Sequence, residues 1–232
     1  MTVVSALMLA GMFYATEPAA QRNQEVFNKR AVLSAVSTHL GKKLGEMSDA
    51  EVLEIFNKQV EQVVVNMKGE PQDGVKAEKV DLAQEKKKPE ADRLLPVFIY
   101  SDANSGKKYY ILSIRGNGLW DEIWGNIALE GDLNTVAGAS FDHKGETPGL
   151  GAEIKDNPTF SAQFINKHIF DDKGGFVSVI VRKGGARDPQ HEVDAISGAT
   201  ITSNGVTEMI KRGLQYYMPY FDKVKQAQTG MR

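Results

Sequence analysis

The segment Asp194-Ala195-Ile196-Ser197-Gly198-Ala199-Thr200-Ile201-Thr202-Ser203-Asn204-Gly205-Val206 decides how the second half of the chain is interpreted. It contains four hydroxyl side chains and two glycines immediately before or at a predicted helix start: Ser197, Thr200, Thr202, Ser203, Gly198 and Gly205. Hydroxyl donors and the N–H groups of a helix N-terminus favour an anion, and glycine lets the backbone approach it. An ordinary helix cap rich in Ser and Thr has the same composition, so these residues alone leave both interpretations open.

Around this segment the pattern predicts a small α+β domain with an antiparallel sheet and flanking helices. Downstream, apolar residues at helical spacing predict a helix over Asn204 to Lys223. Pro158 suits the first turn of a shorter helix. The predicted strands are Val97 to Ser101, Lys107 to Arg115, Trp124 to Glu130, Thr135 to Phe141 and Phe176 to Arg182. No G-x-G-x-x-G follows a strand, which disfavours a Rossmann dinucleotide site.

Composition excludes several classes of function. Lys and Arg (28) nearly balance Asp and Glu (30) in the 232 residues, so a net charge of -2 gives no support to nucleic-acid binding. The absence of cysteine excludes disulfides, zinc-cysteine sites, iron–sulfur ligation and thiol nucleophiles, and four scattered histidines offer little for a metal site. Any redox chemistry must therefore use a non-metal cofactor.

The N-terminal region predicts a membrane-associated layout. Thr2 to Thr16 carries no charge but is shorter than the ~20 residues of a spanning helix. A partial transmembrane helix is favoured over a buried core helix, so residues 1–16 are interpreted as a membrane anchor. Residues 17–93 would form a membrane-proximal region with a helix over Glu17 to Leu40, a capping box at Ser48 to Glu51 and a strand over Val60 to Met67. Within this region, Lys68 to Arg93 reads as a solvated, mobile insertion, and residues 94–232 would form the main domain.

Three motifs then resemble a known family. Asp194-x-x-Ser197-Gly198-Ala199-Thr200 resembles the D-x-x-[ST]-G-A-[ST] signature at which FMN-binding domains receive flavin through a phosphoester bond. Glu146-Thr147-Pro148-Gly149-Leu150-Gly151 and Gly118-Leu119-Trp120 resemble two further elements of such domains. These domains occur in the NqrC component of the sodium-translocating NADH:quinone oxidoreductase (Nqr) and in the RnfG component of the related Rnf complex. NqrC is the better match, because of the long insertion and the residues from Trp120 to Gly125.

The resemblance implies covalent FMN on Thr200, attached by a flavin transferase that uses FAD and magnesium. The other implied flavin-binding residues are Asp194, Ser197, Gly198, Ala199, Thr202, Ser203, Leu119, Trp120, Glu146, Thr147, Pro148, Gly149 and Leu150. The chain would be a one-electron relay without catalytic or metal-binding residues of its own. It would work with the other Nqr subunits in the bacterial inner membrane, as a single-pass protein with its flavin domain on the periplasmic side. The alternatives are RnfG or another extracytoplasmic electron carrier, and a colourless, non-redox envelope adaptor.

Two polar residues near the motifs allow further expectations. An ionised Glu146 beside a flavin would disfavour an anionic semiquinone, so its carboxylate is expected to turn toward a hydroxyl or a main-chain N–H. His143 lies close to a motif, where a surface or capping role is favoured over a place in the pocket. None of the central histidines has the spacing of a catalytic triad.

Overall fold

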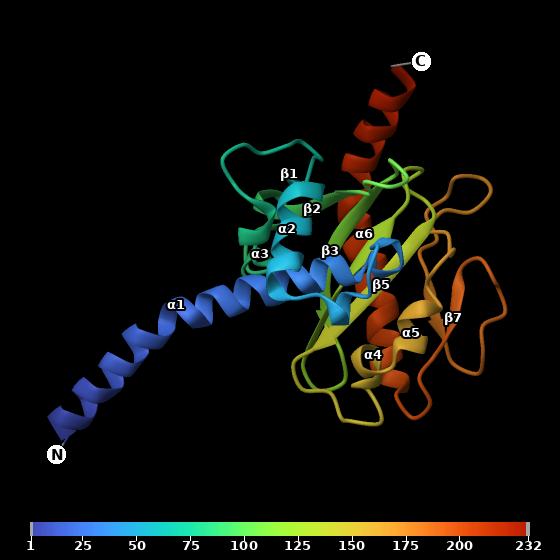
Figure 1. Ribbon diagram of the computed structural model, residues 1–232. Helices are drawn as coiled ribbons and strands as arrows, with labels where there is room; N and C mark the ends of the chain where they lie inside the picture. The colour runs from blue at the N-terminus through green and yellow to red at the C-terminus, as the bar shows by residue number, and fades with distance from the viewer. Residues whose placement is uncertain (1, 231–232) are drawn as a thin grey trace.

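The structure is a computed structural model that describes residues 2–230, with side chains from residue 5 onward. Its centre is a five-stranded antiparallel sheet in the order β1-β2-β3-β4-β5, with helices on both faces (Figure 1). The strands are β1 (Val60–Asn66), β2 (Leu94–Ser101), β3 (Lys108–Asn117), β4 (Glu122–Leu129), β5 (Val136–His143), β6 (Ile180–Arg182) and β7 (Glu192–Asp194). The α-helices are α1 (Thr2–Ser34), α2 (Asp49–Gln59), α3 (Leu82–Glu85), α4 (Glu153–Asp156), α5 (Pro158–Ala162) and α6 (Thr200–Gly230). Short 3-10 helices occur at Ser37–His39, Leu44–Glu46, Ala77–Lys79 and Glu90–Asp92.

One face of the sheet is covered by α6, with α4 and α5 packed at the β5 edge. The buried face of α6 contains the predicted apolar stripe Val206, Ile210, Leu214 and Tyr217. The Tyr217 hydroxyl lies 2.9 Å from the carbonyl oxygens of both Pro96 and Ser113, which ties α6 to β2 and β3. The predicted α+β fold with an antiparallel sheet and flanking helices is therefore confirmed.

The opposite face of the sheet is covered by the end of α1 and by α2. The predicted capping box starts α2, because the Ser48 hydroxyl accepts the N–H of Glu51 and the Glu51 carboxylate accepts the N–H of Ser48. Phe56 of α2 packs in the same core as Leu33 and Val36, which lie at the end of α1 and just after it. This second core is smaller than the first and leaves part of the sheet uncovered.

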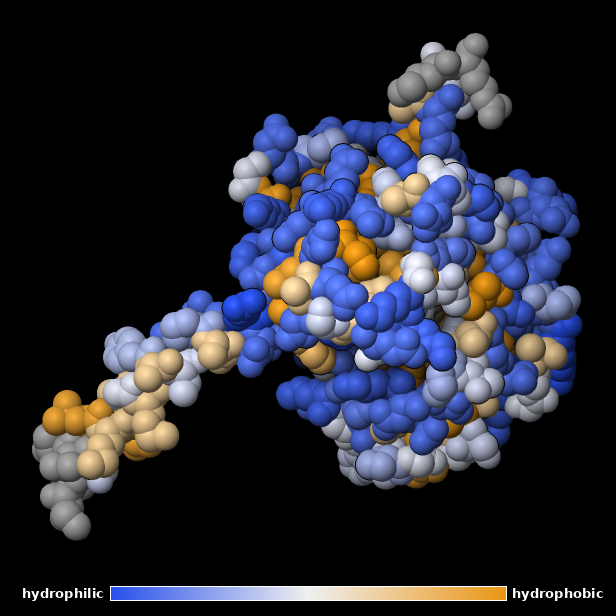
Figure 2. Space-filling view, viewed as in Figure 1, coloured by the Kyte–Doolittle hydropathy of each residue, from blue (hydrophilic) through white to orange (hydrophobic). Residues whose placement is uncertain are grey.

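Helix α1 is continuous from Thr2 to Ser34, so the apolar stretch and the helix predicted after it form one element that ends six residues before Leu40. Its N-terminal half projects from the body (Figure 1), and Figure 2 shows apolar residues gathered there. The exposed ones include Leu7, Met12 and Phe13. No helix within residues 2–230 contains a stretch long and apolar enough to cross a membrane. The anchor at residues 1–16 stays a prediction.

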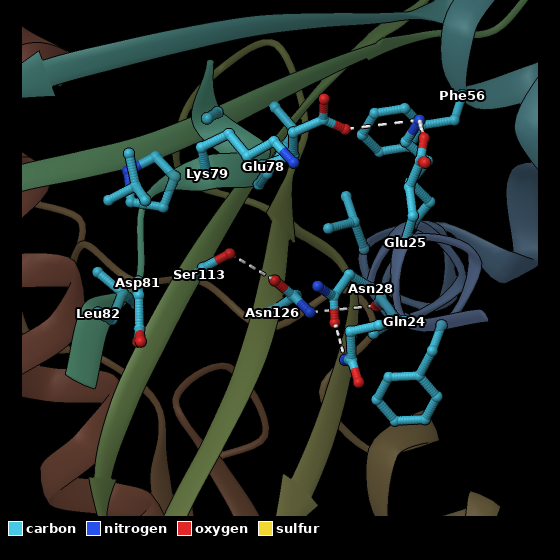
Figure 3. A pocket seen from close by; sticks show the side chains of 18 of the residues that line it. Gln24, Glu25, Asn28, Phe56, Glu78, Lys79, Asp81, Leu82, Ser113 and Asn126 are labelled. Atoms are coloured by element: carbon cyan, nitrogen blue, oxygen red, sulfur yellow. Dashed lines mark hydrogen bonds and ion pairs between the residues drawn. The ribbon is translucent and has the colours of Figure 1, made fainter. Parts of the chain in front are cut away.

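The end of α1 is held across the sheet by specific contacts. Its Ala31 carbonyl accepts the Asn126 amide at 3.1 Å and the Ser140 hydroxyl at 3.3 Å. At Gly138 a Cβ would overlap the carbonyl oxygen of Ala35, so only glycine fits beneath this turn. A cavity of about 1180 Å³ remains beside the helix, between α1, the segment 77–82 and the sheet, with Asn126 on its floor (Figure 3).

The insertion at Lys68 to Arg93 is more tightly packed than its composition predicts. Ala77 is only 2% exposed, and the Glu85 carboxylate accepts the N–H of Leu94 at 3.0 Å. The prediction of a solvated, mobile insertion was wrong in this respect, because the high average charge of the segment gives no sign of the individual residues that are buried. The sheet also crosses the predicted boundary at residue 93, since β1 pairs with β2 along its whole length.

A second difference concerns the strand predicted over Phe176 to Arg182, of which only β6 forms. Ser178 has a φ of 67°, a left-handed conformation that interrupts an extended strand. The remaining three residues pair in parallel with β7, which the sequence did not predict.

Candidate functional site

The three motif segments meet at one end of the five-stranded sheet. Gly118 to Trp120 form the turn between β3 and β4, and Glu146 to Gly151 lie in the loop that follows β5. The segment 194–206 runs from the end of β7 into the first turns of α6. This end of the sheet, beside α4, lies lowest in Figure 1.

A buried carboxylate joins the three segments. Glu146 Oε1 accepts the main-chain N–H of Trp120 at 3.0 Å, and Glu146 Oε2 accepts the hydroxyl of Thr202 at 2.6 Å. The N–H of Glu146 donates to His143 Nδ1 at 3.1 Å. The carboxylate therefore turns toward a hydroxyl and a main-chain N–H, as expected, and His143 has the capping role.

Glycines make this close packing possible. A Cβ at Gly118 or Gly151 would overlap the carboxylate of Glu146, and a Cβ at Gly205 would overlap the carbonyl oxygen of Asn117. Each of the three motif segments thus contributes a glycine at a point where chain segments approach closely.

The four hydroxyls of the segment differ in how they are used. Thr202 and Ser203 are buried, with Thr202 bonded to Glu146 and the Ser203 hydroxyl accepting the N–H of Ile196 at 3.3 Å. Ser197 is exposed and Thr200 half-buried, and neither side chain makes a hydrogen bond within residues 5–230. Thr200 is the first residue of α6, and at about 100° per residue its side chain lies on the opposite side of the helix from Thr202.

The remaining signature residues shape the chain around Thr200. Gly198 has a φ of 77°, and a Cβ there would come within 2.7 Å of Leu150. The Asp194 carboxylate accepts the N–H of Ala186 at 2.7 Å, which fixes the loop between β6 and β7. Ala199 is buried beneath the start of the helix.

Exposed apolar side chains from all three motif segments border the start of α6. Trp120 is 69% exposed, and its indole N–H donates to the hydroxyl of Thr147 at 3.1 Å. Leu119, Leu150 and Ile201 are also exposed. Pro148 and Gly149 form the exposed tip of the loop beside them. Ile201 was not predicted as a site residue, and the helix was predicted to begin only at Asn204; the available signal was an apolar side chain directly after Thr200. The four apolar residues Leu119, Trp120, Leu150 and Ile201 are called the apolar rim below.

This arrangement combines two kinds of binding chemistry. The first N–H groups of a helix have no partner within the helix and attract an anion, and α6 presents them beside the hydroxyl of Thr200. The apolar rim offers surface for an aromatic ring system, which aromatic and aliphatic side chains bind by packing. An aromatic group that carries a phosphate fits both features.

Comparison with known proteins supports the same interpretation. The model of a family described as FMN-binding domain matches residues 118–215, which include all three motifs. The chain is 34% identical to NqrC, the C component of the Na(+)-translocating NADH-quinone reductase, of Pseudomonas aeruginosa, over 90% of this chain and 85% of that protein. The chain belongs to the NqrC family. The corresponding protein of Neisseria meningitidis is 31% identical, over 97% of this chain and 91% of that protein.

Solved structures of the NqrC family share the fold. The crystal structure of the corresponding protein from Parabacteroides distasonis has a TM-score of 0.75 and 35% identity, covering 87% of this chain and 94% of that chain. That of NqrC from Shewanella oneidensis has a TM-score of 0.74 and 30% identity, covering 90% and 99%. The resemblance drawn from the three motifs is confirmed.

Proposed function

We propose that this chain carries FMN, linked through its phosphate to Thr200, as a one-electron relay in a Na(+)-translocating NADH-quinone reductase complex. The observation that carries the proposal is the position of Thr200, whose side chain makes no hydrogen bond within residues 5–230 at the start of α6. Membership of the NqrC family and the match to FMN-binding domains support the same cofactor.

The residues present fit this cofactor. The N–H groups of the first turn of α6 would hold the phosphate, and the apolar rim would pack against the ring. Gly198 lets the chain turn back toward Leu150 so that both features lie together. The remaining signature and loop residues would shape the pocket. When bound, FMN supplies the redox chemistry, and the protein supplies its position and surroundings.

The attachment step balances if a flavin transferase uses FAD as donor. The oxygen of Thr200 would form a bond to the FMN phosphorus while the phosphoanhydride bond of FAD breaks. AMP would leave, and the proton of the threonine hydroxyl would pass to solvent or to a base of the transferase.

The relatives are named as subunits of a larger reductase, so the partners proposed here are the other subunits of that complex. The exposed apolar half of α1 supports an anchor at residues 1–16 in a bacterial inner membrane. The body built on the five-stranded sheet, which includes β1, would carry the flavin and lie on the periplasmic side.

The decisive experiment replaces Thr200 with Ala in protein co-expressed with the transferase. Removing one half-buried hydroxyl that has no hydrogen-bond partner among residues 5–230 should change stability by less than about 1 kcal/mol, yet no phosphoester can form. Intact mass and flavin fluorescence in a denaturing gel report the covalent bond. Thr229→Ala, which removes an exposed hydroxyl near the far end of the same helix, should retain flavin and is the control. Covalent flavin on Thr200→Ala would reject the attachment site, and a colourless parent protein would reject the flavin function.

A further inference from the structure

Glu146 is an unusual buried charge in this fold. It is only 5% exposed, and within residues 5–230 it forms no ion pair. Its two oxygens instead accept one hydrogen bond each, from the Trp120 N–H and the Thr202 hydroxyl. A buried carboxylate without a cation is costly unless such bonds are retained, so both contacts are important for the local structure.

The partners of Glu146 lie on the inner side of the two elements that face the proposed flavin. Trp120 offers its main-chain N–H to the carboxylate while its indole is exposed on the apolar rim. Thr202 points inward from α6, whereas Thr200 points to the other side of the same turn. The carboxylate thus holds both elements from the side opposite the apolar rim. Both of its oxygens already accept hydrogen bonds from the protein in the absence of a ligand.

The surrounding chain is shaped to hold the carboxylate in one place. Gly118 and Gly151 approach it from two directions, and a side chain at either position would overlap it. His143 Nδ1 accepts the N–H of Glu146 and so fixes the main chain of the residue as well. Glu146 therefore has little freedom to swing toward the apolar rim.

We propose that Glu146 is a positioning residue that sets Thr200 in register with Trp120, and that it does not contact the flavin. This inference rests on the proposed function, because it assigns a role in attaching and seating the cofactor at that site. Loss of the carboxylate lets the turn at Gly118 to Trp120 and the start of α6 move independently. The Thr200 hydroxyl is then misplaced relative to the rim that holds the ring.

Four variants test this role. Glu146→Ala removes both contacts, and Thr202→Val removes one of them while keeping the size of the side chain. Glu146→Gln keeps the shape, because its amide oxygen can accept one bond and its NH₂ can donate to the Thr202 oxygen. Glu208→Ala, which removes an exposed carboxylate from the same helix, is the control.

Two measurements are made on each variant. Hydrogen exchange of the flavin-free protein reports the mobility of residues 117–122 and 198–204 without any cofactor. The rate of flavin attachment by the transferase reports the position of Thr200. We expect faster exchange in both segments and an attachment rate at least about tenfold lower for Glu146→Ala and Thr202→Val, as expected for loss of one hydrogen bond to a charged group. Glu146→Gln and Glu208→Ala should behave as the parent does.

The outcomes separate this inference from the proposed function. Glu146→Ala or Thr202→Val with parental attachment rates would overturn it. So would loss of attachment in Glu146→Gln with unchanged hydrogen exchange, since that would indicate direct contact with the flavin or the transferase. If Glu146→Ala does not fold, the isosteric Thr202→Val decides the question. A parent protein that never acquires covalent flavin would reject the proposed function itself.

Discussion

Replacing Gly205 with Ala tests the contact between α6 and the end of β3. Gly205 lies in the second turn of α6, where a Cβ would overlap the carbonyl oxygen of Asn117 and lie 3.4 Å from the Cα of Gly118. Helix propensity alone favours Ala over Gly by about 1 kcal/mol. Overpacking costs about 1–3 kcal/mol, and the upper part of that range applies because a main-chain carbonyl cannot rotate away. We therefore expect a net loss of about 1–2 kcal/mol in the free energy of unfolding.

Urea unfolding followed by circular dichroism measures this change, with the slope m unchanged if only stability is affected. Gly11→Ala is the control, because it makes the same substitution in a helix where the added Cβ meets no described atom within 4 Å apart from its chain neighbours and its own helix backbone. It should cause no loss of stability. A Gly205→Ala protein more stable than the parent would refute the close approach of α6 to β3, and with it the placement of Thr200 beside the turn at Gly118.

Two further predictions concern the scaffold. Tyr217→Phe should lower the free energy of unfolding by about 1–2 kcal/mol, because it removes the hydroxyl that faces the carbonyls of Pro96 and Ser113. Tyr216→Phe is the control, and equal urea midpoints for Tyr217→Phe and the parent protein would contradict the prediction. The N–H of Ser48, with smaller contributions from Lys42 and the Ser48 hydroxyl, lowers the pKa of Glu51 from 4.5 to about 2. Its contribution to stability is present above pH 4.5 and lost as the pH falls toward 2, so Glu51→Gln should flatten that part of the acid-unfolding profile; a profile identical to the parent's would count against the capping box.

Local sequence patterns predicted much of the fold because each pattern depends only on residues that are close together in the sequence. Short segments rich in apolar residues indicated β2 to β5, and the box at Ser48 to Glu51 indicated the start of α2. The packed insertion was missed because Ala77 is buried by strands distant in sequence. Ser178 was missed because nothing in its side chain signals a left-handed backbone.

The candidate site was predicted as a set of motifs but not as an arrangement. Spacing identified the three segments, and the resemblance identified Thr200. The sequence could not show that Thr202 bonds to Glu146, because these residues are 56 positions apart and meet only when β5 and α6 pack on the same sheet. For the same reason the sequence could not distinguish the hydroxyls that form hydrogen bonds within the protein, those of Thr202 and Ser203, from those that remain available to a ligand.

The continuous helix α1 has a mechanical consequence. Its last turns are fixed to the sheet through Ala31 and to the loop after it through Arg30, which donates to the carbonyl of Leu44 at 2.7 Å. The projecting half is therefore joined to the sheet by a continuous helix, which contains Pro18, and not by a flexible linker. Each residue added within such a helix turns everything beyond it by about 100° and displaces it by about 1.5 Å. A partner that binds the far end of α1 would therefore determine the orientation of the face containing Thr200 as well as its distance from that partner.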